Sequence, residues 1–256
     1  MGTLHVARLA SGPGRTIVAA HALGLDHGMW TSWARHLEGR HTLLAFDHRG
    51  HGRSAPMDGR SMRGLCDEVA ALLPRWSDHP VVFVGLSMGG MVGQGLAIHH
   101  AACLQALVLA HTVSHYDEPA RAAWADRIAA VQRGGMAEVA DAVVQRYLHA
   151  AARAADPAAA RRLRDTLLAR RAEDYAACCA AVAGVDWQAE LGRIAVPTLV
   201  LAGALDAGAP PAAAQAIAQA VGHARCEVID GASHLSPWEQ PAAFARHLDG
   251  FLESLP

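Results

Sequence analysis

Three side chains of this sequence could together perform nucleophilic chemistry: Ser87, Asp206 and His234. Ser87 is the centre of the string Gly-Leu-Ser-Met-Gly at 85–89, between an apolar run and a stretch of small residues. A serine hydroxyl is a weak nucleophile until a neighbouring base accepts its proton. The Gly-x-Ser-x-Gly spacing permits the strained strand-to-helix turn that exposes such a serine. A chain with 24 glycines could also contain this pattern in an ordinary tight turn.

The acid and the base come after later strands of the predicted fold. Asp206 follows a predicted strand at 197–203, and His234 follows another at 224–229. The chain order serine, acid, base is typical of hydrolases in which the carboxylate orients a histidine that takes the serine proton. Asp230 is the alternative acid, although it lies only four positions before the histidine. Asp206 could instead merely cap a turn, and His234 could be a surface histidine.

Two backbone N–H groups are expected to bind the negative charge that develops on a substrate carbonyl oxygen. Met88 supplies the first, because it begins the helix that follows the serine. Leu23 supplies the second, from the loop after a predicted strand at 16–20. Since backbone groups act at both positions, the side chains there are little constrained.

The elements that must position these groups alternate between strands and helices. Strands are predicted at 4–9, 16–20, 42–46, from Val81 to the serine turn, and at 104–110, 197–203 and 224–229, and helices at 29–37, 62–76, 88–100, 212–221 and 240–255. This alternation predicts an α/β fold with a mostly parallel central sheet and helices on both faces. Functional groups of such a sheet gather beyond the carboxyl ends of the strands, where the serine, acid and base are all expected.

The alternation is interrupted by an Ala- and Arg-rich segment with helical periodicity and no convincing strand. We interpret it as a helical cap, 114–185, inserted into a core that comprises 1–113 and 186–256. Alanine is the best helix former, so the Ala-rich part of this segment is expected to be helical.

Composition excludes several classes of function. A formal net charge of -2 and a pI near 6.8 offer no basic face for nucleic acid and no polybasic membrane anchor. The five cysteines are odd in number and lie in apolar or helical contexts, so reduced thiols and a cytoplasmic location are expected. The first residues lack the regions of a signal peptide, and no apolar run approaches a membrane span. The sequence does not predict an oligomeric state.

No metal or cofactor is predicted. The pairs His99-His100 and His48/His51 have no carboxylate or cysteine partner at ligand spacing in the sequence. A dinucleotide site would need glycines where 85–90 has a serine and a methionine. The expected partner is a small-molecule ester or lactone.

Several longer strings resemble one family, the 3-oxoadipate enol-lactonases of the α/β-hydrolase superfamily. The turn at 47–54 and the serine turn at 85–94 look like those of the family, and the turn at 47–54 is shared by much of the superfamily. More specific are 174–181 in the cap and 232–241 around the base. The resemblance extends from about His21 to Phe244. It implies an α/β-hydrolase fold and hydrolysis of an enol-lactone to 3-oxoadipate in the degradation of aromatic compounds.

A substrate of this kind carries a carboxylate, so a cation is expected in the cap. Arg127 is the candidate, with a solvated side chain as the alternative, and Trp124 is expected in the pocket lid unless it only packs in the core. The string at 146–148, Ala209 and the segment 111–117 depart from the family pattern at the cap and pocket walls. A broader carboxylesterase, another lactonase and a non-catalytic ligand receptor on the same fold are therefore the alternative functions.

Overall fold

The computed structural model describes residues 4–256. Residues 1–3 lie outside the described residues, although the predicted core and the prediction that no signal peptide is present both include them. The described chain contains a seven-stranded sheet in the order β1-β3-β2-β4-β5-β6-β7. Its strands are β1 (Val6–Ala10), β2 (Thr16–Ala20), β3 (Thr42–Phe46), β4 (Val81–Leu86), β5 (Leu104–Ala110), β6 (Thr198–Gly203) and β7 (Arg225–Ile229). β1 runs antiparallel to β3, and the other neighbours are parallel. The prediction of a mostly parallel sheet is confirmed.

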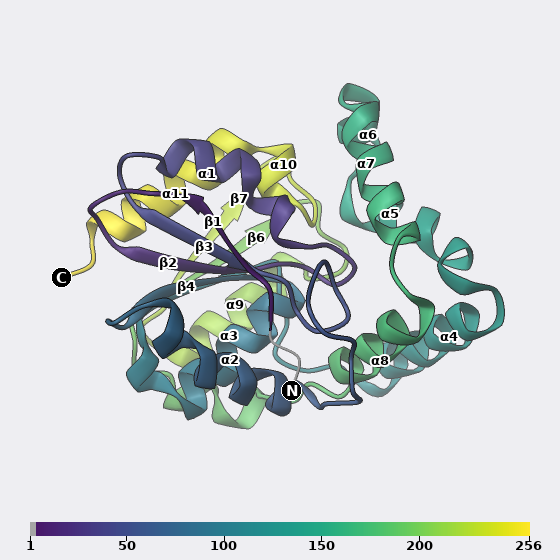
Figure 1. Cartoon of the computed structure of the whole chain (residues 1–256), viewed down its shortest axis with the longest axis horizontal. Coiled ribbons are helices and arrows are strands. Elements are labelled where there is room, and N and C mark those ends of the chain that lie inside the picture. Colours follow the sequence, from purple (N-terminus) through teal and green to yellow (C-terminus); the bar gives the residue numbers. More distant parts are fainter. Residues whose placement is uncertain (1–3) are drawn as a thin grey trace.

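Helices cover both faces of this sheet (Figure 1). One face carries α1 (Thr31–Leu37) and α11 (Pro241–Glu253), and the other carries α2 (Met62–Trp76), α3 (Met88–His99) and α9 (Pro211–Val221). Because both faces are covered, all residues of β4 and β6 are buried. The short helices η1 (His27–Trp30), η2 (Ala101–Cys103), η4 (Gln188–Arg193) and α10 (Ser236–Glu239) lie in connections. None of the described helices is both long and apolar enough to cross a membrane.

The chain between β5 and β6 forms a separate group of helices on one side of the sheet (Figure 1). These are α4 (Glu118–Gly134), η3 (Gly135–Glu138), α5 (Ala140–Tyr147), α6 (Ala150–Ala155), α7 (Pro157–Leu168) and α8 (Ala172–Ala183). The two ends of the segment meet, because the Trp187 N–H donates to the Ser114 carbonyl at 2.8 Å and His115 bridges Asp186. We therefore propose 114–185 as the bounds of a helical cap on a core of 1–113 and 186–256.

Among the helix starts that differ from the prediction, two have clear local causes. The helix predicted at 29–37 is preceded by the 3-10 turn η1, whose cap Asp26 accepts a hydrogen bond from the Gly28 N–H at 3.0 Å. The helix predicted at 240–255 begins at Pro241, and α10 forms a separate turn before it. Gln240 lies between them with φ -137° and ψ 58°, because a following proline ring disfavours the helical conformation.

Three buried histidines join the loop after β2 to the loop after β3. His51 Nε2 accepts a hydrogen bond from the Gly24 N–H at 2.8 Å, and His21 Nε2 accepts one from the His48 N–H at 3.0 Å. A ring nitrogen that accepts carries no proton, so His21 and His51 are neutral. Burial lowers the pKa of His51 to about 4 and that of His48 to about 3. Neutral imidazoles therefore hold the loop that contains Leu23.

These histidines should make folding sensitive to acid. Their folded pKa values lie below the ordinary 6.5, so the unfolded chain binds more protons as the pH falls below that value, and the unfolding free energy decreases. Between the pKa of the folded state and that of the unfolded state, each histidine lowers the unfolding free energy by up to about 1.4 kcal/mol per pH unit as the pH falls. His48→Phe, which keeps a ring against Phe46, should flatten the dependence measured by urea unfolding. The exposed control His79→Gln should not, and equal slopes for both variants would contradict the prediction.

The start of α3 lies unusually close to the sheet. A Cβ atom on Gly89 would be 2.2 Å from the Ala20 carbonyl oxygen, and one on Gly85 would be 2.1 Å from the Gly89 carbonyl oxygen. Both obstacles are backbone atoms, which cannot turn away as a side chain can. The two glycines that flank Ser87 are therefore required by close approach of the backbone.

Gly89→Ala should destabilise the protein, because the added methyl group overlaps the β2 backbone. We expect the unfolding free energy to fall by about 1–3 kcal/mol or more in chemical denaturation. Gly250→Ala is the matched control, since Gly250 lies in α11 with no atom within 4 Å of the added Cβ, and it should gain about 0.5–1 kcal/mol. Similar stabilities for the two variants would show that the close approach is not needed.

Candidate active site

Ser87 occupies the sharp turn between β4 and α3. Its backbone has φ 57° and ψ -113°, a strained conformation for a residue other than glycine. The turn is held by hydrogen bonds from the Ser87 N–H to the Ala110 carbonyl (2.9 Å) and from the Thr112 hydroxyl to the Ser87 carbonyl (2.8 Å). The strain is offset by these neighbours, and the serine lies at the carboxyl end of the strand.

His234 and Asp206, from the loops after β7 and β6, form a buried pair. The separation between His234 Nδ1 and Asp206 Oδ2 is 2.8 Å. Asp206 Oδ1 accepts hydrogen bonds from the N–H groups of Gly208 (2.8 Å) and Ala209 (3.0 Å). The carboxylate is thus fixed at both oxygens and directs the other ring nitrogen of His234 away from itself. Asp230, the alternative acid, is exposed and has no hydrogen bond to His234 within residues 4–256.

Asp206 is kept ionised although it is buried. Burial alone would raise the pKa of this carboxyl group, but the positive potential and the hydrogen bonds of His234 and His111 hold it well below its usual range. A carboxylate of this kind stabilises positive charge on a neighbouring imidazole. The pair can therefore support a histidine that gains a proton during a reaction.

His111 shares the same carboxylate, which the sequence did not lead us to expect. Its Nδ1 lies 3.1 Å from Asp206 Oδ2, and its Nε2 lies 2.7 Å from the Ser236 hydroxyl. Burial lowers the pKa of His111, against the opposing effect of Asp206. The available signal was its position directly after β5, at the edge of the sheet where the other groups lie.

A pocket between the sheet and the cap brings most of the predicted residues together. It is lined by Leu23, Ser87, Met88, Met91, His111, Thr112, Val113, Tyr116, Trp124, Arg127, Arg146, Tyr147, Val182, Gly208, Ala209 and His234. Asp206 lies behind His234. No hydrogen bond joins the Ser87 hydroxyl to another described residue, a situation common in unliganded sites whose contacts tighten when substrate binds.

The two predicted oxyanion donors, Leu23 and Met88, both line this pocket. The Leu23 N–H has no hydrogen-bond partner among the described residues. Met88 is the first residue of α3, where the helix provides no carbonyl for its N–H. The hydroxyl of buried Tyr147 donates to the Leu23 carbonyl at 2.9 Å, and its ring lies 4.8 Å from that of His234. Tyr147 thus fixes the Leu23 peptide, a role that the sequence did not reveal.

Trp124 and Arg127, the predicted binding residues, lie together on the cap side of the pocket. The Arg127 guanidinium carbon is 4.5 Å from the centre of the Trp124 ring, within range of a cation–π contact. Arg146, which the sequence analysis did not select as a ligand, also lines the pocket. Neither guanidinium has an ion pair with a carboxylate of residues 4–256, and no acidic residue is among the lining residues. The pocket therefore offers positive charge to a ligand.

The group His111, Asp206 and His234 could geometrically hold a metal ion, since it offers ligand atoms within 4.8 Å of one another. Three of the four ring nitrogens already have partners, because Asp206 Oδ2 bonds the Nδ1 atoms of both histidines and the Ser236 hydroxyl bonds His111 Nε2. The hydrogen-bonded arrangement accounts for these side chains without an ion.

Comparisons with known proteins agree with the geometry. The α/β hydrolase fold family matches residues 15–241. The chain is 31% identical over 238 residues to 3-oxoadipate enol-lactonase 2 of Acinetobacter baylyi, a match that covers 93% of this chain and 88% of that protein. The crystal structure of the enol-lactonase from Burkholderia xenovorans LB400 superimposes with a TM-score of 0.92 at 32% identity, covering 98% of this chain and 96% of that one.

A thermophilic esterase from Thermogutta terrifontis is also similar, with a TM-score of 0.90 and 28% identity over 98% of this chain and 94% of that chain. The resemblance to enol-lactonases and the prediction of an enzyme that acts on ester bonds are both confirmed by these relatives. Because the family match and the enol-lactonase match each span most of the sequence, this protein belongs to the α/β-hydrolase fold family.

Proposed function

We propose that this protein is a cytoplasmic serine hydrolase that converts 3-oxoadipate enol-lactone to 3-oxoadipate in the β-ketoadipate pathway of aromatic degradation. The observation that carries the proposal is the lining of the pocket, which includes a serine, a histidine and two arginines without an ion-pair partner among residues 4–256, and no acidic residue. The enol-lactone is a small anionic ester, so both its reactive bond and its carboxylate have complementary groups. The similarity to enol-lactonases supports the same substrate.

In the first half of the proposed reaction, His234 removes the proton from the Ser87 hydroxyl as its oxygen attacks the lactone carbonyl carbon. The carbonyl oxygen becomes an oxyanion and accepts hydrogen bonds from the N–H groups of Leu23 and Met88. Collapse of this intermediate breaks the ring carbon–oxygen bond and releases an enolate oxygen, which receives the proton that His234 took from Ser87 and leaves the imidazole neutral. The product is an acyl-enzyme on Ser87 whose freed end is an enol and then a ketone.

In the second half, His234 takes a proton from water, and the resulting hydroxide attacks the acyl carbon. The Ser87 oxygen leaves, recovers a proton from the imidazolium and is ready for another cycle. Asp206 keeps the His234 ring oriented and stabilises its charge in both halves. His111 contacts the same Asp206 oxygen as His234 does, which limits the movement of the carboxylate.

The alternative function is a carboxylesterase, or another lactonase, with a broader range of small esters. It is favoured by the similarity to the thermophilic esterase, because the triad and oxyanion donors serve any ester equally well. The two functions differ in what the cap binds. Only a substrate with a negative group gains from Arg127 and Arg146.

A substrate panel tests the proposal, with enol-lactone, other lactones and short aryl esters as its members. The wild type should hydrolyse the enol-lactone with the highest kcat/KM, and Ser87→Ala should lower that value at least about 10³-fold because no other nucleophile is in place. Ser32→Ala, which alters an exposed serine in α1, is the control. Turnover of aryl esters without turnover of the enol-lactone would favour the broader esterase, and full activity of Ser87→Ala would refute the serine mechanism.

Arg127→Gln should weaken binding of the substrate carboxylate while leaving the chemistry intact. A lost hydrogen bond to a charged group corresponds to an increase of about 10- to 100-fold in KM for the enol-lactone, with kcat/KM for a neutral aryl ester nearly unchanged. Arg121→Gln, on an exposed part of the same helix, should change neither value. If only Arg146→Gln raised KM for the lactone, the carboxylate ligand would be Arg146 instead.

A further inference from the structure

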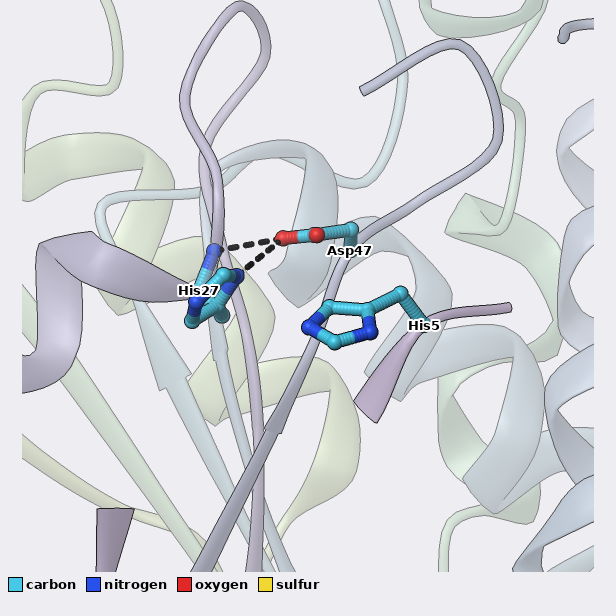
Figure 2. A group of neighbouring side chains, drawn as sticks. All are labelled: His5, His27 and Asp47. Carbon is cyan, nitrogen blue, oxygen red and sulfur yellow. Dashed lines mark hydrogen bonds and ion pairs between the residues drawn. The ribbon is translucent and has the colours of Figure 1, made fainter. Parts of the chain in front are cut away.

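A second group of side chains with the chemistry of a ligand site lies outside the pocket. It consists of His5, just before β1, His27, in η1, and Asp47, just after β3 (Figure 2). Each offers one ligand atom, and these atoms lie within 4.8 Å of one another. None of the three lines the catalytic pocket. The proposed hydrolytic reaction therefore does not explain why these three potential ligands lie so close together.

Asp47 and His27 are already held in fixed positions. Asp47 Oδ1 accepts hydrogen bonds from the His27 backbone N–H at 2.7 Å and from its Nδ1 at 2.8 Å. Asp47 Oδ2 accepts another from the Arg53 N–H at 2.9 Å. These contacts leave little freedom for the carboxylate. An ion that bound Asp47 Oδ1 would meet a preformed ligand instead of a flexible surface side chain.

His5 is fixed through its backbone and has an unused ring nitrogen. Its N–H donates to the Ser54 hydroxyl at 2.8 Å, and its carbonyl accepts from the Asp47 N–H at 2.9 Å. Its Nε2 is shielded from solvent and has no hydrogen-bond partner among the described residues. Figure 2 shows a ring nitrogen of His5 directed at His27, and the two ring centres are 5.1 Å apart. A buried nitrogen without a partner is costly unless a ligand uses its lone pair.

We propose that His5, His27 and Asp47 form a binding site for Zn²⁺, with water as a fourth ligand. Two imidazoles and one carboxylate form a ligand set that suits zinc and is poor for the harder ions Mg²⁺ and Ca²⁺, which prefer oxygen. The proton between His27 Nδ1 and Asp47 Oδ1 is released to solvent when the ion replaces it. Bond lengths to zinc of about 2.0–2.2 Å then require these two atoms to separate by about 0.5 Å from their hydrogen-bonded distance.

The side of the site open to solvent is that of His27, whose side chain is 22% exposed, whereas the Asp47 side chain is fully buried. Bound zinc would link the N-terminal strand to η1 and to the loop after β3, three segments that otherwise meet through hydrogen bonds. We therefore assign the ion a structural role, separate from hydrolysis. Residues 5, 27 and 47 are too far apart in the sequence for a local ligand spacing to indicate that they meet.

Calorimetric titration of chelator-treated protein with ZnCl₂ tests the site. We expect one equivalent to bind, to raise the Tm and to leave hydrolysis of a neutral aryl ester unchanged. His5→Phe, which keeps a ring beside His27, and His27→Asn, which keeps a donor toward Asp47, should each lower the affinity at least about tenfold. Both variants should also lose the zinc-dependent rise in Tm. Asp47 itself is left intact, because its carboxylate also bonds backbone N–H groups.

The matched control is His36→Asn. His36 also pairs with a carboxylate, Asp249 at 2.7 Å, but belongs to no group of three such ligands among the described residues. Its zinc affinity should equal that of the wild type. The proposal is overturned if zinc fails to bind, if binding survives unchanged in both His5→Phe and His27→Asn, or if the single equivalent inhibits hydrolysis, which would place the ion at His111, Asp206 and His234.

Discussion

The site depends on one buried carboxylate, that of Asp206. Its two oxygens receive hydrogen bonds from His234, His111 and two backbone N–H groups, so the charge is distributed over four donors that come from the ends of three strands. A buried charge is tolerated only when it is satisfied in this way. The same contacts set the orientation of His234. A change that disturbs the hydrogen bonds of the carboxylate would therefore also move the proposed base.

The sheet and the cap contribute different groups to the pocket. The loops at the end of the sheet provide the serine, the histidine and the backbone N–H groups that the proposed reaction uses. The segment between β5 and β6 provides Trp124, Arg127 and Arg146, which line the same pocket. Tyr147 connects the two parts, because it extends from the cap to the Leu23 carbonyl beside the proposed oxyanion site. Movement of the cap would thus also shift the Leu23 peptide at the proposed oxyanion site.

Much of the fold could be predicted from local patterns. The strands at 16–20, 42–46 and 104–110 and the helix at 62–76 have the predicted bounds, because buried strands are continuous apolar runs and Ser61 caps the helix. Starts that depend on one cap or one proline, such as those of η1 and α11, were less accurate. His111, Tyr147 and Arg146 were not selected as site residues, because their places in the site depend on contacts with segments far away in the sequence.

The sequence by itself determined the order of strands and helices and placed Ser87, Asp206 and His234 after strands. That was enough to predict that they share one edge, because the carboxyl ends of parallel strands lie together. Only the tertiary structure decided the contacts between distant segments: His111 and Asp206 are 95 positions apart, and Tyr147 and Leu23 are 124 apart. The meeting of His5, His27 and Asp47 was decided in the same way. Such contacts depend on how loops and the cap pack against the sheet, which no local periodicity encodes.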